Sequence, residues 1–421
     1  MTDFSNKRVL IYDLGLFTEL GVTLAKSFGD VLYYSPWQSP FPKSNSRIIG
    51  EGLAPNMHRI QDIWKYIDED SVDLYVFPDV GDGGLQMHLR SIGKRVWGSG
   101  YGEQLEMFRP ESKKHLKSVG IPVYNWKIVK GIDNLRAYLK VHDNVWVKVS
   151  TVRGDFESFK AVDYKNIEPK IDELEYRLGA KGKHYEFIVE DSIDDAVEVG
   201  WDGYCIDGQY PTQVMYGVES KDKGYIGHFQ PYDKGPEPIL EVNAKIAPTL
   251  EKYQYRNNWA LECRITEDGT PWAIDPCCRF GAPPNELQQV MYTNLADIIW
   301  EGAGGVCIDP IPADEYGAEL LIHSSFADQN WQAITIPDDI RQYVKLRNCT
   351  KIDSEYYVVP QAVGLPEIGA VVATGPTIEA AVNLCKKRAS MIQGYMVECF
   401  DDCLEDVTEQ IATLKKYGIN F

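Results

Sequence analysis

The sequence predicts an α/β protein built from several domains. In the first 100 or so residues, short apolar runs alternate with amphipathic stretches, which is typical of a parallel sheet covered by helices. Further along, a strong hairpin signal at Asp268-Gly269 joins two alternating strands and predicts α+β lobes. A chain of 421 residues is long for one core, so we expect domains at residues 1–104, 105–304 and 305–421.

The composition predicts a folded protein, and the net charge argues against broad binding to polyanions. The sequence is 44% apolar and 12% aromatic, which is enough for packed interiors, and its formal net charge is −19. Such an acidic surface is a poor match for duplex nucleic acid or an anionic membrane. A local basic cleft could still hold a nucleotide. The charge therefore argues only against broad binding to polyanions.

The cysteines and the N-terminus indicate where the protein functions. Nine cysteines occur without paired CxxC spacing, which favours reduced thiols over a zinc framework. The first residues contain no apolar signal core, and no apolar run approaches about 18 residues. We therefore expect a soluble, cytoplasmic protein that does not enter the membrane. The sequence does not predict an oligomeric state.

The N-terminal region reads as strands and helices in alternation. Strands are expected at residues 8–12, 31–34, 74–77 and 95–97, and helices at 16–28 and 85–92. In a parallel sheet of this kind, ligands lie at the carboxyl ends of the strands. The region has no G-x-G-x-x-G motif, so a dinucleotide site is not expected.

The middle region places charged residues in unusual settings. A helix expected from Glu111 to Gly120 carries Lys113, and a strand at residues 145–149 contains one lysine, Lys148, among apolar residues. A lysine that points inward from a strand costs desolvation energy unless an anion accepts it. A further strand at residues 185–190 ends in the acid Glu190. The alternative interpretation of these charges is a solvated helix face and an acidic loop.

A second concentration of charge follows in the stretch from Trp259 to Glu286. Glu262 and Asp275 lie on the two arms of the expected hairpin, and Arg279 follows in a proline-rich loop. Two carboxylates and a guanidinium suit a divalent ion that holds a polyphosphate, with the arginine on developing negative charge. A solvated hairpin with surface charges is the alternative.

The remaining segments carry fewer signals. Between residues 204 and 258 periodicity is weak, and we expect loops at 221–223 and 225–229, where His228 is either a base or a structural residue. A single helix is expected at 287–300. The C-terminal region predicts strands at 319–323, 356–359 and 370–373, a helix after Gly375-Pro376-Thr377 and a final helix at 399–416. Cys385 lies on the apolar stripe of the first of these helices, which indicates a core residue.

Taken together, these motifs resemble those of ATP-grasp ligases, and the Arg279-Phe280-Gly281 segment is most similar to phosphoribosylamine–glycine ligase. In that family an acid-x-Asn-x-Arg run closes the site. Asp275 and Arg279 match it, whereas Cys277 replaces the asparagine. The resemblance implies an ATP-grasp fold with an N-terminal parallel-sheet pre-ATP-grasp domain and a small C-terminal α+β domain.

The resemblance also implies roles for individual residues, with ATP and Mg²⁺ as cofactors. Lys113 and Lys148 would contact the nucleotide phosphates, and the hinge acids Glu190 and Glu198 would contact the adenine and the ribose. Glu262 and Asp275 would bind Mg²⁺, and Arg279 would contact the acyl phosphate. Arg153 would clamp an anion from the loop at residues 150–155, where the family has a glycine-rich flap.

The implied function is an ATP-dependent carboxylate–amine ligase that acts on small molecules through an acyl phosphate. A small amino acid such as glycine is a possible carboxylate donor. The family's Gly-Gly-Arg-Glu-His run after the first strand is replaced here by residues 13–17, which argues against a phosphosugar acceptor. Asp79, Asp82 and the glycines beside them could line the acceptor pocket or form a flexible turn. The alternative function, favoured by Cys277, is a protein that only binds a nucleotide.

Overall fold

The computed structural model of the chain describes residues 2–36, 49–149, 158–360 and 367–421 and divides into two compact units. Unit 1 contains Met1–Glu103, Val199–Ala260 and Cys277–Phe421, and unit 2 contains Gln104–Glu198 and Leu261–Pro276. The residues expected in the second domain are distributed over both units, and those expected in the third belong to unit 1.

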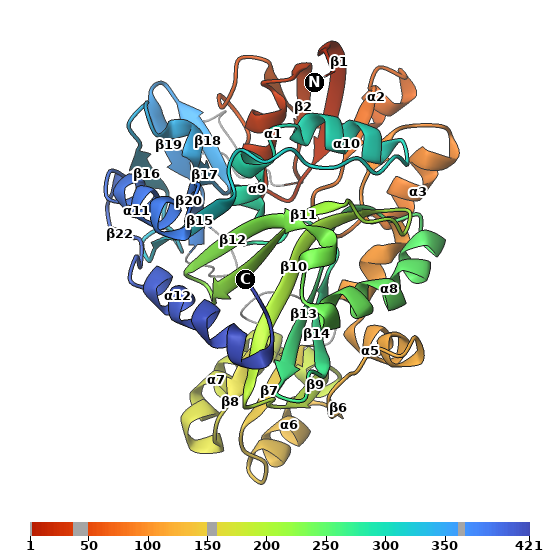
Figure 1. The fold of residues 1–421 in the computed structure, drawn as a ribbon, viewed down its shortest axis with the longest axis vertical. Coiled ribbons are helices and arrows are strands. Elements are labelled where there is room, and N and C mark those ends of the chain that lie inside the picture. The colour runs from red at the N-terminus through yellow and green to blue at the C-terminus, as the bar shows by residue number, and fades with distance from the viewer. Residues whose placement is uncertain (1, 37–48, 150–157, 361–366) are drawn as a thin grey trace. The chain divides into compact units, whose positions relative to one another are not determined.

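Unit 1 begins with a five-stranded parallel sheet, which confirms the expected α/β start (Figure 1). The order across the sheet is β3-β2-β1-β4-β5, with β1 Phe4–Tyr12, β2 Phe28–Tyr34, β3 Met57–Ile60, β4 Leu74–Val76 and β5 Val96–Trp97. From β1 the chain adds β2 and β3 on one side and then β4 and β5 on the other. The strand order therefore reverses between β1 and β4, the position where α/β sheets bind ligands.

Both faces of this sheet are buried. Leu10 pairs in register with Leu32 and Tyr75, and these three share a core with residues of α2 (Trp64–Asp68), α3 (Gly83–Ser91) and the segments around them. On the other side, Trp300 of α10 (Leu295–Ala303) contacts the rings of Phe4 and Phe28. The helix expected at 16–28 is shorter, since α1 spans Thr18–Leu24 and Phe28 pairs with Phe4 at the start of β2.

A nine-stranded sheet has the order β14-β13-β10-β11-β12-β15-β20-β17, with β22 paired to β15. The chain passes between the two units within β10, β13 and β14. The bounds are β10 Ala196–Ile206, β11 Gln213–Ser220, β12 Gly224–Pro231, β13 Arg256–Thr266, β14 Pro271–Cys277, β15 Tyr316–Ser324, β17 Val344–Leu346, β20 Glu367–Gly375 and β22 Val397–Glu398. A four-stranded sheet of order β18-β19-β16-β21 completes unit 1, with β16 Gln332–Thr335, β18 Cys349–Ile352, β19 Glu355–Val358 and β21 Gln393–Gly394.

Two segments of unit 1 differ from the sequence prediction. Residues 225–229, expected as a loop, belong to β12, which pairs with β11 and β15. The helix expected at 287–300 is two helices, α9 (Asn285–Met291) and α10. The helix breaks because Thr293 N donates to Ile311 O and the Asn294 side chain bonds the backbone of residues 309 and 311.

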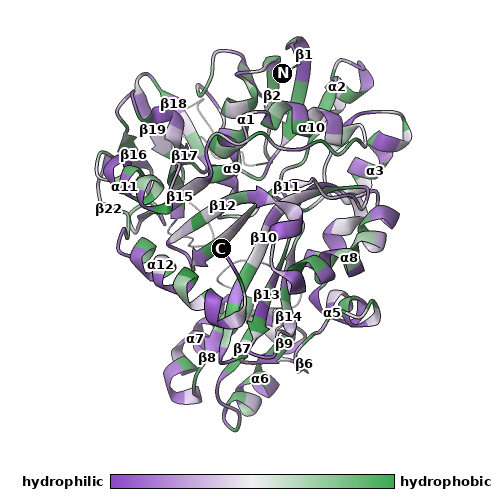
Figure 2. Ribbon diagram, viewed as in Figure 1, coloured by the Kyte–Doolittle hydropathy of each residue, from purple (hydrophilic) through white to green (hydrophobic). Residues whose placement is uncertain are grey.

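The helices of unit 1 bury one face each. In Figure 2, α11 (Ile378–Ala389) and α12 (Cys403–Leu414) show both hydrophobic and hydrophilic residues. Cys385 of α11 is fully buried, as expected, and so are Leu404 and Leu414 of α12. The final helix begins four residues later than predicted. A further helix, α8, spans Glu237–Lys252 where only weak periodicity was recognised.

Unit 2 is organised around a four-stranded antiparallel sheet of order β6-β9-β7-β8. Its elements are β6 Trp126–Lys130, β7 Val145–Val149, β8 Ser158–Ala161, β9 Glu186–Asp191, α4 Gln104–Met107, α5 Arg109–Ser118, α6 Ile132–Leu139 and α7 Tyr164–Leu178. Val147, Phe187 and Val189 pack with apolar residues of α6 and α7 to form the core. Because side chains alternate along a strand, the residues between them face the other side of the sheet.

None of the described helices combines the length and the apolar character needed to cross a bilayer.

The start of α11 provides a test of the local structure. Thr377 accepts a hydrogen bond from Ala380 N at 3.1 Å and so caps the helix. We expect Thr377→Ala to lower the free energy of unfolding by about 1 kcal/mol, whereas Thr377→Ser keeps the cap and most of the stability. Chemical denaturation of the two variants checks this, and equal losses in both would contradict the capping role.

Candidate functional site

A buried group of charged side chains lies on the face of the unit 2 sheet that α6 and α7 leave uncovered. In β7 and β9, Trp146 pairs with Glu190 and Lys148 pairs with Ile188, so Lys148 and Glu190 lie diagonally on the same face. The side chains of the two residues are 4% and 10% exposed. The alternation of side chains along these two strands therefore places a lysine and a carboxylate on the same face of the sheet.

Helix α5 and strand β14 add further charges to this group. Lys113 Nζ lies 3.0 Å from Glu190 Oε1, and Lys148 Nζ lies 3.3 Å from Glu190 Oε2 and 2.7 Å from Asp275 Oδ2. Arg109, one turn before Lys113 on α5, has its Nε 3.8 Å from Asp275 Oδ1. We call these five residues the charge cluster. It places three cations beside two carboxylates.

The backbone around Asp275 is held in place by contacts within unit 2. Lys113 Nζ donates to Ile274 O at 3.1 Å, and Ala273 N donates to Pro122 O at 2.9 Å. The rings of Tyr124 and Trp272 meet edge to face at 5.0 Å. These contacts fix the strand that carries Asp275 against the segment that follows α5.

The charges of the cluster stabilise one another. Burial would raise the pKa of Asp275, but the attraction of Lys148, Lys113 and Arg109 outweighs it and lowers that pKa below the ordinary value. Burial would likewise lower the pKa of Lys148, but Asp275 and Glu190 raise it. Asp275 is therefore a carboxylate and Lys148 an ammonium ion at neutral pH. The excess of cations attracts an anion although the chain as a whole carries −19.

The other predicted site residues of unit 2 lie elsewhere or outside the described residues. Glu262 lies on β13, and Glu198 is exposed on β10. Burial, followed by the charges of Glu262 and Glu198, raises the pKa of Cys263, so both acids lie near that thiol. Arg153 falls within residues 150–157, which the structure does not describe.

Arg279 belongs to unit 1, where three loops meet. Its Nε lies 3.8 Å from Asp79 Oδ1, and its Nη1 donates to Phe280 O at 3.2 Å. Phe280 is fully buried, its N donates to Pro78 O at 3.0 Å, and its ring contacts Phe17 at 6.1 Å. The loop after β14 is therefore tied to the loops that follow β1 and β4. The structure places Arg279, which the resemblance assigns to the acyl phosphate, beside Asp79, which the sequence left as part of an acceptor pocket or of a flexible turn.

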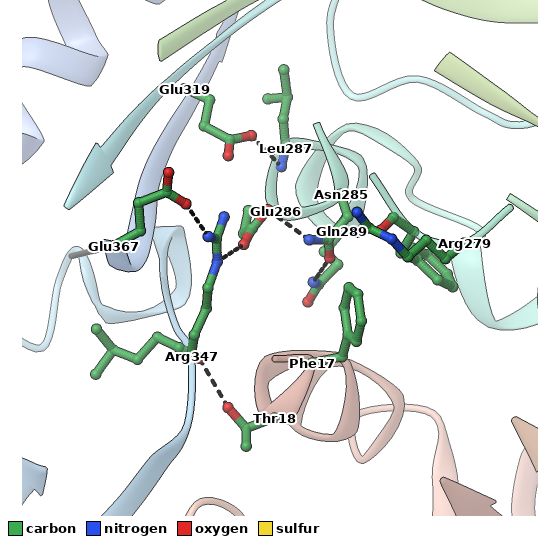
Figure 3. A network of polar contacts seen from close by, with 12 residues as sticks. Phe17, Thr18, Arg279, Asn285, Glu286, Leu287, Gln289, Glu319, Arg347 and Glu367 are labelled. Carbon is green, nitrogen blue, oxygen red and sulfur yellow. Dashed lines mark hydrogen bonds and ion pairs between the residues drawn. The ribbon is translucent and has the colours of Figure 1, made fainter. Parts of the chain in front are cut away.

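A network of buried polar contacts holds the segment after Arg279 (Figure 3). Arg347 Nε bonds Glu286 Oε1 at 2.8 Å, and Arg347 Nη1 bonds Glu367 Oε2 at 2.5 Å. Glu319 Oε2 accepts from Leu287 N at 3.1 Å. Burial, and then the charge of Glu286, raises the pKa of Glu319. The start of α9 is thus bound to β15, β20 and the end of β17, and these contacts support the loop that carries Arg279.

The charge cluster fits a nucleotide phosphate better than a free metal ion. Mg²⁺ prefers oxygen ligands and usually binds one or two carboxylates together with substrate phosphates. Among the described residues, no three His, Cys, Asp or Glu side chains come together as a metal site. Asp275 can supply one oxygen to a metal that arrives with a polyphosphate. The thiol of Cys277, whose Sγ lies 3.7 Å from Arg279 O, is a poor ligand for Mg²⁺.

The sequence matches no protein-family model, and no curated protein is similar to it in sequence. The structure, in contrast, is similar to solved structures along nearly its whole length. Phosphoribosylamine–glycine ligase from Thermotoga maritima has a TM-score of 0.70 and 16% identity over 93% of this chain and 98% of that one. The biotin carboxylase domain of the 2-oxoglutarate carboxylase from Hydrogenobacter thermophilus, solved with MgADP and bicarbonate, has a TM-score of 0.67 and 13% identity over 97% and 95%.

L-amino acid ligase from Bacillus licheniformis has a TM-score of 0.61 and 14% identity over 93% of this chain and 99% of that one. These proteins are ATP-grasp ligases. The chain has the ATP-grasp fold. The resemblance that the sequence motifs indicated is therefore confirmed at the level of the fold.

Within this ATP-grasp fold, the charge cluster contains one residue that the sequence analysis missed. Arg109 precedes Pro110 at the start of α5, and the helix was expected to begin only at Glu111. The signal that could have found it is its spacing of four residues from Lys113, which places both side chains on one helix face. Glu286 and Arg347 are likewise recognisable only from their burial and contacts.

Acid titration tests the charge cluster. A carboxylate whose pKa falls on folding stabilises the protein above its unfolded pKa of about 3.9, and this contribution disappears as pH falls through the lower folded pKa. We expect the stability gap between the wild type and Asp275→Asn to be full above pH ~5 and to shrink below pH ~4. Urea denaturation across this range measures it. Asp143→Asn, which removes an exposed carboxylate of unit 2, is the control, and a gap independent of pH would contradict the pairing.

The network around Arg347 makes a second prediction. The Arg347 side chain is 6% exposed, so Arg347→Met leaves buried carboxylates without their partner and should cost about 3–5 kcal/mol. Arg8→Met removes an arginine whose side chain is 38% exposed and paired to Asp30, and should cost less than about 1 kcal/mol. Denaturation of both variants gives the comparison. Equal losses would show that the buried network contributes no more than a surface pair.

Proposed function

We propose that this protein is an ATP-dependent carboxylate–amine ligase. ATP transfers its γ-phosphoryl group to a substrate carboxylate, giving ADP and an acyl phosphate. The amine nitrogen then attacks the acyl carbon, the bond to the phosphate oxygen breaks, and amide, phosphate and a proton are released. The observation that carries the proposal is the charge cluster, in which two nearly inaccessible lysines stand beside two carboxylates on one sheet face.

The proposed roles follow from the chemistry of each side chain. Lys113 and Lys148 bind phosphate oxygens, and Arg109 adds a third positive charge at the same place. Glu190 pairs with both lysines and, by the resemblance to ATP-grasp ligases, also accepts from the adenine, while Glu198 binds the ribose. Arg279 stabilises negative charge on the acyl phosphate, and Arg153 clamps a phosphate from its loop.

Magnesium, when bound with ATP, neutralises charge on the β- and γ-phosphates. Asp275 and Glu262 are the proposed ligands. Asp275 lies 2.7 Å from Lys148, so its carboxylate would contact both a bound metal and the lysine proposed to bind the phosphates.

The substrates are proposed from the resemblance and from the fold neighbours. A small amino acid such as glycine is the proposed carboxylate donor, and L-amino acid ligase is among the similar structures. All nine cysteines are free thiols in the structure, which supports a reducing compartment such as the cytoplasm. The second candidate, a protein that binds a nucleotide without turnover, is favoured by Cys277, which replaces an oxygen ligand beside Asp275 with a thiol.

Two substitutions separate binding from chemistry. Lys148→Ala should abolish measurable ATP binding, because it removes a buried cation and leaves two carboxylates facing the phosphates. Arg279→Ala should retain ATP binding and lower the rate of ADP release by about 10²–10³-fold, the usual effect of losing a donor to a developing anion. ATP binding by calorimetry and ADP release with a panel of amino acids and amines measure both.

Lys130→Ala is the matched control, because Lys130 lies on β6 of the same sheet with an exposed side chain. It should bind ATP and turn over like the wild type. Binding of ATP without ADP release under any substrate mixture would favour the second candidate. Full turnover by Arg279→Ala would remove Arg279 from the mechanism.

A further inference from the structure

The side chains around Arg347 in unit 1 include more acids than bases. Figure 3 shows the carboxyl groups of Glu286, Glu319 and Glu367 around its guanidinium group, and the charge of each acts on it. The side chains of Glu286 and Glu367 are 3% and 12% exposed, and Glu319 is fully buried. Three carboxylates beside one arginine would leave an excess of buried negative charge, which is costly away from water.

Two of the three acids have the partners that a carboxylate needs. Arg347 Nε donates to Glu286 Oε1 at 2.8 Å, and Arg347 Nη1 donates to Glu367 Oε2 at 2.5 Å. The second oxygen of Glu286 accepts from Asn285 Nδ2 at 2.6 Å. Charge-assisted hydrogen bonds to a guanidinium group favour the ionised form of an acid. Arg347 therefore stabilises Glu286 and Glu367 as carboxylates.

Glu319 has fewer partners. Its Oε2 accepts one hydrogen bond, from Leu287 N at 3.1 Å. Among the described residues its buried Oε1 has no hydrogen-bond partner, and neither has the buried Nη2 of Arg347. A backbone N–H is a neutral donor and compensates a buried charge less than a guanidinium group does. Of the three acids, Glu319 is therefore the one whose surroundings favour a neutral carboxyl group.

The electrostatic surroundings of Glu319 agree with its hydrogen bonds. Burial raises the pKa of Glu319 and the charge of Glu286 raises it further, and together they outweigh the attraction of Arg347 and the hydrogen bond from Leu287 N. The other groups that act on this carboxyl group, or on its two charged neighbours, are Glu219 of β11, Tyr225 of β12, Cys385 of α11, Glu367 of β20 and Lys345 of β17. Of all these groups, Arg347 is the cation that opposes protonation of Glu319.

We propose that Glu319 carries a proton in the folded protein and acts as a pH-sensitive switch at the start of α9. The proton removes the repulsion between Glu319 on β15 and Glu286 on α9. When the proton is lost at higher pH, the two carboxylates repel each other and weaken the contact between β15 and the first turn of α9. That turn directly follows the loop that carries Arg279, so the switch acts on the fixation of Arg279. Neither ATP nor a substrate takes part in it, and it therefore goes beyond the proposed function.

Glu319→Gln tests the proton, because glutamine has the size of a protonated glutamic acid and no charge. A carboxyl group whose pKa rises on folding stabilises the protein below its unfolded pKa of about 4.3, and this contribution is lost as pH rises through the folded pKa. The stability of the wild type relative to Glu319→Gln should therefore fall above pH ~5, by up to about tenfold in the unfolding equilibrium constant per pH unit. Urea denaturation from pH ~5 to pH ~9 measures this. A difference that does not change with pH, or a variant that loses stability relative to the wild type as pH rises, would overturn the proposal.

Glu19→Gln is the matched control. Glu19 is also a buried glutamate of unit 1, but its two oxygens accept hydrogen bonds from Arg341 at 2.6 and 3.3 Å. The stability difference between the wild type and Glu19→Gln should stay constant above pH ~5. A fall like that expected for Glu319→Gln would show that the pH dependence is not specific to Glu319 and would overturn the proposal.

Carbon-13 labelling of the glutamate carboxyl groups keeps the test valid if Glu319→Gln fails to fold. Carboxyl-carbon NMR of the wild type distinguishes a protonated acid from a carboxylate, and the label leaves the aspartates unseen. We expect one signal to remain that of a protonated group above pH ~6. Burial also raises the pKa of Glu103, so Glu103→Gln identifies its signal. If every other glutamate were ionised by pH ~6, Glu319 would carry no proton.

Hydrogen exchange tests the effect on α9. The amides of residues 278–291 are followed by mass spectrometry in the wild type and Glu319→Gln at the same pH, so that intrinsic exchange rates are equal. We expect equal protection at pH ~6 and lower protection in the wild type at pH ~9, where local opening becomes easier. Equal protection at both pH values would overturn the switch. Because no nucleotide is present, these results do not depend on whether the protein is a ligase.

Discussion

The contact on which the proposed chemistry depends is the buried pairing of Lys148 with Asp275 and Glu190. Two lysines and an arginine cannot be removed from water on one sheet face unless carboxylates accompany them. The alternation of β7 and β9 supplies Lys148 and Glu190, α5 supplies Lys113 and Arg109, and β14 supplies Asp275. Because the group retains an excess of positive charge, it can exchange its internal partners for a polyphosphate. The cluster is thus a locally positive group within a strongly acidic chain.

Unit 1 contributes a different kind of constraint. Arg279 follows directly on β14 and is held by a buried aromatic residue on one side and by the network of Arg347 on the other. A guanidinium assigned to a transition state has to be fixed before the reaction, since reorientation during the reaction would consume the stabilisation it provides. The contacts around Phe280 and Glu286 provide such fixation.

The sequence predicted those features that depend on local pattern. The strand at residues 145–149 has the expected bounds because an apolar run with one lysine can hardly form anything else, and Gly269 has the φ of +82° that its turn requires. Features that depend on distant contacts were missed. Residues 225–229 of β12 contain Gly227, where a side chain would collide with Met215 and Tyr225, so the strand lacks a regular pattern. Helices α9 and α10 are separated by bonds to residues 309–311, and Arg109 joins the cluster only through the docking of α5.

Calorimetry of the purified protein with ATP and with adenosine, each with and without Mg²⁺, is the most direct test of the central claim. If the charge cluster is a phosphate site, ATP binds and adenosine binds far more weakly, since the cations of the cluster contact only the phosphates. Mg²⁺ should strengthen ATP binding and leave adenosine unaffected. Equal binding of the two ligands, or no binding of ATP with or without Mg²⁺, would mean that the buried lysines and carboxylates stabilise the fold and do not bind a nucleotide.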